Sequence, residues 1–398
     1  MRQIFGQKLY ILKFWLLLSA VLLVYAVNVE AQKTIIAEPK PTPAKAQTET
    51  VEEDAEVLRV ETELISVPAV VLDKSGKPIP KLKAGNFAVF EDNVPQKIEN
   101  FVTADAPFEI ALLLDTSGST RSELGLIQRS AQAFINALRP GDKVSIVAFK
   151  SEVFDGKREA VVDVIAELTD DREQLSSALE TINTSSGTPF YEALEIIGNR
   201  IFKNQPLPNQ RGRRAIVALT DGVDSTSAIE FQDARAEIST RGLSVYFVQL
   251  NTEDFIEDRV MGDCDDETAV SFSKTQLRRY KKMLKTPKGA ARPELENFCD
   301  MGQFERMDIS RKLYKLARFE MEELSKSTGG KVFPVEELRE ARAAFAQVAQ
   351  EIGTQYSLGY YSTNQKRGGA FRRIRVELKG LPAGAQIQSR EGYTTQNQ

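Results

Sequence analysis

Four short apolar runs separated by helical patterns constrain the fold of this chain most strongly. The runs are Glu109 to Leu114, Lys143 to Phe149, Ala215 to Leu219 and Ser244 to Gln249. The helical patterns between and after them are at about Glu123 to Leu138, Arg172 to Ile182, Tyr191 to Phe202 and Ile229 to Thr240. Short buried strands alternating with helices predict an α/β fold, a doubly wound parallel sheet with helices on both faces.

Oxygen-bearing side chains follow two of these runs. Asp115, Ser117 and Ser119 stand in the D-x-S-x-S segment after the first run, Asp221 follows the third run, and Thr188 precedes a helix that begins after Pro189. Ligands of such sheets bind beyond the carboxyl ends of the strands, and carboxylate and hydroxyl oxygens suit Mg²⁺. The D-x-S-x-S segment taken alone is also compatible with an ordinary turn, followed by a capping box of Thr120 and Glu123.

The three loops together, in this order, resemble the metal-ion-dependent adhesion site of the von Willebrand factor A domain. The resemblance implies that Asp115, Ser117, Ser119, Thr188 and Asp221 hold Mg²⁺, with Mn²⁺ or Ca²⁺ as alternatives, and that the fold is Rossmann-like. It also implies an open coordination position that accepts a carboxylate of a protein or peptide partner. Asp224 is interpreted as a turn or helix-cap residue.

The sequence contains no histidine, which excludes Ser-His-Asp and Cys-His nucleophiles and zinc proteases of the H-E-x-x-H type. No P-loop and no glycine-rich dinucleotide fingerprint is present. We therefore expect no enzyme activity but an exported, noncatalytic binding or adhesion protein. The alternatives are a structural or assembly component of the cell envelope without metal-dependent binding, and a metal-assisted hydrolase.

The N-terminus indicates export. Three basic residues precede the apolar run Phe14 to Val27, and small residues follow it, so residues 1–31 are predicted to be a cleaved signal peptide. An uncleaved membrane anchor is the alternative, although the run is short for a bilayer span. The protein would then be periplasmic or extracellular, with a membrane contact only if the segment is retained. Removing residues 1–31 leaves 49 basic and 55 acidic residues, a net charge of −6 that disfavours nucleic acid as a partner.

The chain contains two cysteines, Cys264 and Cys299. In an exported protein a disulfide between them is the natural pairing, and two reduced buried cysteines are the alternative. They make a poor zinc site, since no histidine accompanies them.

The predicted organisation continues beyond the signal peptide. Residues 32–56 form a flexible linker rich in Lys, Pro, Thr, Ala and Glu, 57–104 an N-terminal β unit, 105–353 the A domain, and 354–398 a C-terminal β segment. We expect the two β segments to combine into one β-sandwich, because neither alone has enough strands; separate units are the alternative. The stretches Val71 to Gly76, Phe87 to Asp92 and Tyr356 to Tyr360 resemble a bacterial group of proteins related to the A domain.

Residues 251–311 interrupt the predicted domain as an insertion. Acidic residues dominate its first part, and basic residues follow from Lys274 to Lys288. Such segregated charge is typical of a solvated helical face, and partner recognition is the alternative.

Overall fold

The computed structural model describes residues 64–204, 213–262, 271–284, 298–364, 366 and 368–395, but not the side chains of residues 119, 121 and 122. The predicted signal peptide, the predicted linker and Cys264 lie outside the described residues. Within the described ranges, no helix combines the length and hydropathy needed to cross a bilayer.

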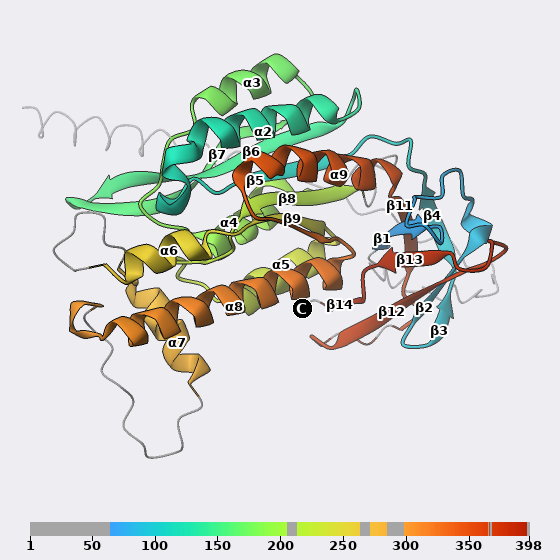
Figure 1. Ribbon diagram of the computed structural model, residues 1–398. Coiled ribbons are helices and arrows are strands. Elements are labelled where there is room, and N and C mark those ends of the chain that lie inside the picture. The colour runs from blue at the N-terminus through green and yellow to red at the C-terminus, as the bar shows by residue number, and fades with distance from the viewer. Residues whose placement is uncertain are drawn as a thin grey trace, which may run out of the picture. The chain divides into compact units, whose positions relative to one another are not determined.

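A six-stranded sheet forms the centre of the α/β part, in the order β10-β9-β8-β5-β6-β7 (Figure 1). Its strands are β5 (Glu109–Leu114), β6 (Lys143–Phe154), β7 (Lys157–Thr169), β8 (Arg214–Thr220), β9 (Ser244–Leu250) and β10 (Val332–Val335). All neighbours pair in parallel except β6 and β7, which are antiparallel. The predicted doubly wound parallel sheet is confirmed.

Alternating side chains of β5 divide the interior into two cores. Ile110, Leu112 and Leu114 contribute to one core, while Ala111 and Leu113 contribute to the other. Both faces of the strand are therefore buried, which explains its unbroken apolar sequence.

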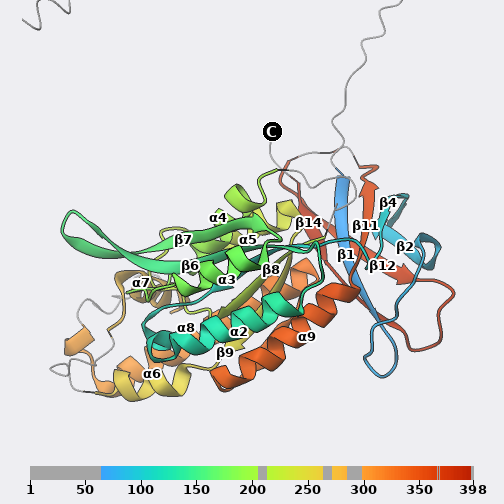
Figure 2. The ribbon, with the colours of Figure 1, turned by 90° about the horizontal axis from the view of Figure 1, so that it is seen from above.

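Helices cover both faces of the sheet (Figures 1 and 2). The first core packs against α2 (Leu124–Ala137), α3 (Arg172–Glu180) and α9 (Ala341–Thr354), and η6 (Leu338–Glu340) leads into α9. The second core packs against α4 (Phe190–Ile196), α5 (Phe231–Arg241) and α8 (Gln303–Thr328). A π-helical turn, η3 (Ile197–Ile201), extends α4.

The antiparallel partner of β6 is a strand that was not predicted from the sequence. Lys157 to Thr169 form β7, and the turn between the strands places Asp155 and Gly156 at positive φ. Because β5 ends at Leu114 opposite Ala148, the rest of β6 continues past the carboxyl end of the parallel sheet. A β-hairpin therefore projects beyond the loops that follow β5 and β8.

Two antiparallel sheets combine strands from both ends of the described chain. One has the order β13-β1-β11-β4 and the other β14-β12-β2-β3. Their strands are β1 (Leu64–Leu72), β2 (Phe87–Glu91), β3 (Val94–Gln96), β4 (Ile98–Val102), β11 (Tyr356–Tyr361), β12 (Phe371–Leu378), β13 (Gln386–Ser389) and β14 (Gly392–Thr394), with η1 (Ala84–Asn86) before β2. A common core that includes Val67, Val89, Leu358 and Val376 joins them. The predicted accessory β-sandwich is confirmed.

The stretch predicted as an insertion is helical where it is described. It contains α6 (Glu253–Val260), α7 (Lys274–Met283) and η5 (Phe298–Asp300). The long helix α8 begins at Gln303, inside this stretch, and leads back to β10. In both views α6, α7 and the tip of the β6–β7 hairpin lie at the same end of the sheet (Figures 1 and 2).

Candidate metal centre

The loops after β5 and β8 and the loop before α4 form a polar edge, which we call the metal edge. Asp115 is fully buried at the end of β5, and its amide donates to Leu219 O at 2.9 Å, which holds it against β8. Its Oδ1 accepts from the Ser117 amide at 3.0 Å, and its Oδ2 accepts from Thr220 Oγ1 at 2.7 Å. Both carboxylate oxygens are therefore fixed by neighbouring backbone and hydroxyl groups.

Asp221 lies at the end of β8 and is 6% exposed. Its Oδ1 accepts from the Val223 amide at 2.9 Å, while Oδ2 accepts from Thr252 Oγ1 at 2.6 Å. Gly222, which follows it, adopts a φ of +75°, a conformation that glycine reaches without steric cost. This turn directs the chain away from the strand immediately after the carboxylate.

Thr188 joins the same edge from the loop before α4. It is 6% exposed, and its backbone pairs with Ser225: the Thr188 amide donates to Ser225 Oγ at 2.8 Å, and the Ser225 amide donates to Thr188 O at 3.0 Å. The Ser185 amide in the same loop donates to Thr116 O at 2.7 Å. These bonds tie the Thr188 loop to the other two loops.

The two serines of the motif stand at the start of η2 (Gly118–Glu123). Ser117 is 5% exposed, and its side chain hydrogen-bonds to Asp115. Ser119 lies within η2, and its side chain is outside the described part of the chain. The structure therefore brings the three loops that carry the predicted site residues to one edge, and their joint role as metal ligands stays a prediction.

The electrostatics of the edge favour a bound cation. Burial raises the pKa of Asp115, and hydrogen bonds from Ser117 and Thr220 oppose that rise. Burial and, after it, the negative charge of Asp115 together raise the pKa of Asp221 to about 7. Two buried carboxylates repel one another, and a bound divalent cation would reduce this repulsion.

The donor set also fits Mg²⁺, which takes a small number of oxygen ligands and retains water. Among the described residues, no group of three or more Asp, Glu, Cys or His side chains is arranged to hold a metal. The predicted site differs from such groups because its remaining ligands are hydroxyls. Metal binding therefore stays a prediction that the chemistry of these residues supports.

Three further residues support the carboxylates and were not predicted. Thr220 holds Asp115, Thr252 holds Asp221, and Tyr314 hydrogen-bonds to Thr252 with 2.7 Å between their hydroxyl oxygens. Thr220 ends β8, and Thr252 lies just beyond the end of β9. Asp221 was predicted because it follows the carboxyl end of a strand, and the same reasoning could have indicated these two threonines. Tyr314 lies on α8, and no local sequence signal indicates this contact.

Asp224 helps to organise the loop next to the predicted site, and its negative charge contributes to the raised pKa of Asp115. Its Oδ2 accepts from the Tyr191 amide at 3.1 Å and from the Ser227 hydroxyl, and its Oδ1 accepts from the Ser227 amide at 3.1 Å. Its Oδ1 also accepts from Arg279 Nη1 at 2.5 Å, and both side chains are almost completely buried. The expected turn role is thus accompanied by a buried ion pair to α7.

Cys299, in η5, takes part in a disulfide bond. Its predicted partner Cys264 lies outside the described residues, so the pairing itself stays a prediction.

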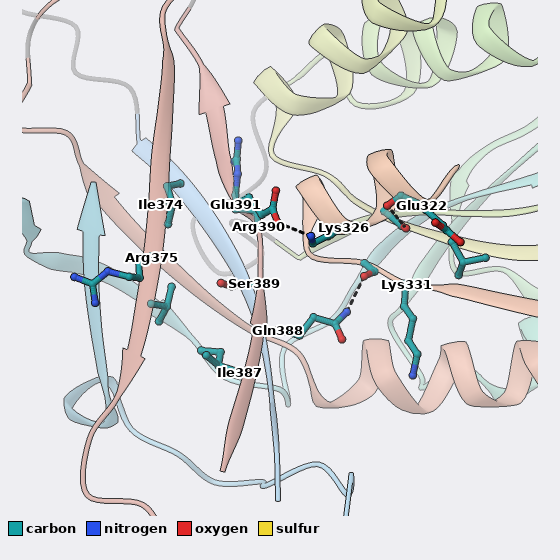
Figure 3. Close-up of a pocket in the computed structure, with 14 residues that line it drawn as sticks. Glu322, Lys326, Lys331, Ile374, Arg375, Ile387, Gln388, Ser389, Arg390 and Glu391 are labelled. Carbon is teal, nitrogen blue, oxygen red and sulfur yellow. Dashed lines mark hydrogen bonds and ion pairs between the residues drawn. The ribbon is translucent and has the colours of Figure 1, made fainter. Parts of the chain in front are cut away.

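A separate cavity of about 740 Å³ lies between α8, β10 and the sandwich strands β12 and β13 (Figure 3). Lys326 pairs with Glu391 across it at 3.4 Å, and Gln388 Nε2 donates to Gly330 O at 2.7 Å. None of the predicted site residues lines this cavity. Its polar groups join the sandwich to the α/β part.

The fold and the metal edge together define a class: a doubly wound domain with a D-x-S-x-S loop, a threonine and an aspartate at the carboxyl edge of its sheet. Residues 110–223 match the sequence profile of the von Willebrand factor type A domain. The chain therefore contains a VWA domain, and domains of this type are typically noncatalytic binding modules.

Several solved structures are similar to this chain. The conserved protein BatB from Bacteroides thetaiotaomicron is 18% identical, with 62% of this chain and 98% of that chain covered and a TM-score of 0.36. A von Willebrand factor type A protein from Catenulispora acidiphila is 11% identical, with coverages of 84% and 74% and a TM-score of 0.38. The pilus adhesin SpaC from Lactobacillus rhamnosus GG is 10% identical, with coverages of 80% and 48% and a TM-score of 0.38. No curated protein matches this chain.

Proposed function

We propose that this protein is an exported, noncatalytic binding protein that captures an acidic group of a protein or peptide partner at a Mg²⁺ site. Asp115, Ser117, Ser119, Thr188 and Asp221 would hold the ion. The observation that carries this proposal is the pair of buried carboxylates at the metal edge, where the charge of Asp115 contributes to the raised pKa of Asp221.

The ligand charges explain why an acidic partner group is favoured. A bound divalent ion would supply a positive centre with an exchangeable coordination position for a carboxylate oxygen. Asp115 and Asp221 offset its two positive charges, and the serine and threonine hydroxyls add none. The site would therefore accept a further carboxylate without the repulsion that a third aspartate would impose.

The supporting residues restrict the motion of these carboxylates. Thr220 and Thr252 each donate a hydroxyl hydrogen to one of them, and Tyr314 contacts Thr252 from α8. Ligands that are held before binding lose less conformational freedom when a partner arrives.

Two observations support export and a noncatalytic role. The N-terminal sequence has the pattern of a signal peptide, and the disulfide bond of Cys299 suits an oxidising compartment. The absence of histidine from the sequence removes the commonest general base.

Ligand-observed NMR with two matched peptides tests the proposal. One peptide carries a single glutamate in a glycine-serine background, and the other carries glutamine at that position. We expect line broadening of the glutamate peptide with the mature protein in Mg²⁺, and none in EDTA or with Asp115→Ala. Asp170→Ala, at an exposed position just after β7, is the matched control and keeps binding. Equal broadening in EDTA, or by the glutamine peptide, would refute the proposal.

A further inference from the structure

Helix α7 is attached to the metal edge through its N-terminus. Ser273 caps the helix, since its Oγ accepts from the Gln276 amide at 3.1 Å, and the same hydroxyl donates to Ser225 O at 2.5 Å. Ser225 Oγ in turn accepts from the Thr188 amide at 2.8 Å. Ser225 therefore connects the first turn of α7 with Thr188, a predicted metal-site residue.

A buried arginine fixes which face of α7 points outward. Arg279 Nη1 contacts Asp224 Oδ1 at 2.5 Å, and Nη2 donates to Ile229 O at 3.2 Å. The guanidinium also lies over the ring of Tyr191, 4.4 Å from its centroid. Leu277 and Tyr280 are buried on the same side. The helix cannot rotate about its axis without breaking this ion pair, so its opposite face stays directed to solvent.

That outer face carries Lys274, Arg278 and Lys282, which we call the basic stripe. All three are exposed, and their spacing of four residues places them along one side of a helix. Arg278 and Lys282 both pair with Glu230, at 3.7 and 2.7 Å, and Lys274 forms no ion pair with any described residue. Two of the three cations thus share one carboxylate and the third has no ion-pair partner among the described residues, which leaves a local positive charge on an acidic protein.

We propose that the basic stripe is a second contact for the same acidic protein partner, binding a run of carboxylates that continues from the one held at the metal edge. This inference rests on the proposed function and specifies its partner: a protein segment with several acidic residues in sequence. Local positive charge on a chain with negative net charge accelerates and orients the approach of such a segment.

The dimensions agree with a short acidic segment. The stripe extends over nine residues of helix, from Lys274 to Lys282, and its ends are about 12 Å apart along the axis. An extended peptide covers this length with about four residues, and ten residues reach about 33 Å. A ten-residue acidic segment is thus long enough to lie along the stripe and leave about six residues, or about 20 Å, to extend toward the metal edge.

The test uses a fluorescein-labelled decaglutamate peptide and fluorescence anisotropy with the mature protein in Mg²⁺. The triple variant K274Q/R278Q/K282Q removes the stripe, and K74Q/K77Q/K379Q removes three exposed lysines of the sandwich as a matched control. We expect the stripe variant to bind the peptide about tenfold more weakly, because three surface charge contacts are lost. The control keeps the affinity of the unchanged protein, and the salt dependence of binding is smaller in the stripe variant.

Unchanged Mg²⁺ binding and an unchanged urea midpoint in the stripe variant verify that its fold and metal edge are intact. Equal losses in the stripe and control variants would overturn the inference. Equal affinity for a single-stranded DNA oligomer of the same charge would overturn it too, since any polyanion would then suffice. Loss of binding in Asp115→Ala with no change in the stripe variant would refute the stripe and leave the proposed function standing. The reverse pattern would refute the metal-dependent function and retain the stripe as an acid-binding surface.

Discussion

Arg279→Met is the substitution that tests most sharply how α7 is held to the rest of the domain. The side chains of Arg279 and Asp224 are 5% and 0% exposed, and their charged atoms approach to 2.5 Å. Removing one partner of a buried ion pair leaves the other charge buried without compensation, which costs about 3–5 kcal/mol. Methionine keeps most of the packing of the aliphatic stem, so the loss reports on the charge and its hydrogen bonds.

The free energy of unfolding by urea measures this effect. Arg278→Met is the matched control, because Arg278 is the preceding residue on the same helix, its side chain is 48% exposed, and its guanidinium lies 3.7 Å from the Glu230 carboxylate. An exposed pair of this kind contributes about 0–1 kcal/mol. We expect the free energy of unfolding to fall by several times more in Arg279→Met than in Arg278→Met.

The same variant connects the insertion with the metal edge. Asp224 lies three residues after Asp221, and its oxygens hold the Tyr191 amide and Ser227. When the ion pair is lost, this loop is less restrained, and Mg²⁺ binding should weaken together with the stability. A loss of stability below about 1 kcal/mol would show that the pair contributes no more than a surface pair does. The account of α7 as rigidly docked would then be wrong.

Two further predictions concern stability. Burial raises the pKa of Glu320 from 4.5 to about 7. The folded state therefore favours the neutral acid, and this carboxyl lowers stability as pH rises from about 4.5 to 7. Over that pH interval, the free energy of unfolding of Glu320→Gln should rise by up to about 3 kcal/mol relative to that of the unchanged protein. Urea titrations that give the same difference in unfolding free energy between the two proteins at pH 4 and at pH 8 would contradict this. In Gly330→Ala the new Cβ would lie 1.9 Å from Val245 O, so we expect a loss of about 3 kcal/mol or more. Gly353→Ala, where the Cβ meets nothing within 4 Å, should not destabilise the protein, and similar thermal midpoints for the two variants would refute the steric argument.

The parallel strands were predictable because each is short, apolar and buried on both faces. Glu109 to Leu114 coincides with β5, and the prediction for β9 ends one residue early. Strand β7 was missed because it is an antiparallel edge strand with exposed charges and shows no continuous apolar run. Asp155 and Gly156 before it are a recognised signal for a hairpin turn and could have indicated it.

The proximity of Asp115 and Asp221 follows from two neighbouring parallel strands that end at the same level. The sequence therefore predicts which carboxylates share an edge once the strand order is known. The contacts that α7 and α8 make with this edge could not be predicted in this way. Arg279 is 55 residues from Asp224, and Tyr314 is 62 residues from Thr252. Both contacts depend on how the helices dock, which local patterns do not specify.

Calorimetric titration of the mature protein with Mg²⁺ measures whether the metal edge binds an ion. Asp115→Ala is measured in parallel, with Asp170→Ala as the control. The account predicts binding of one ion by the unchanged protein and by Asp170→Ala, and none by Asp115→Ala. Binding should weaken as pH falls below about 7, because protons compete for Asp221. Equal binding by Asp115→Ala would contradict the account, since the ion would then occupy a different site.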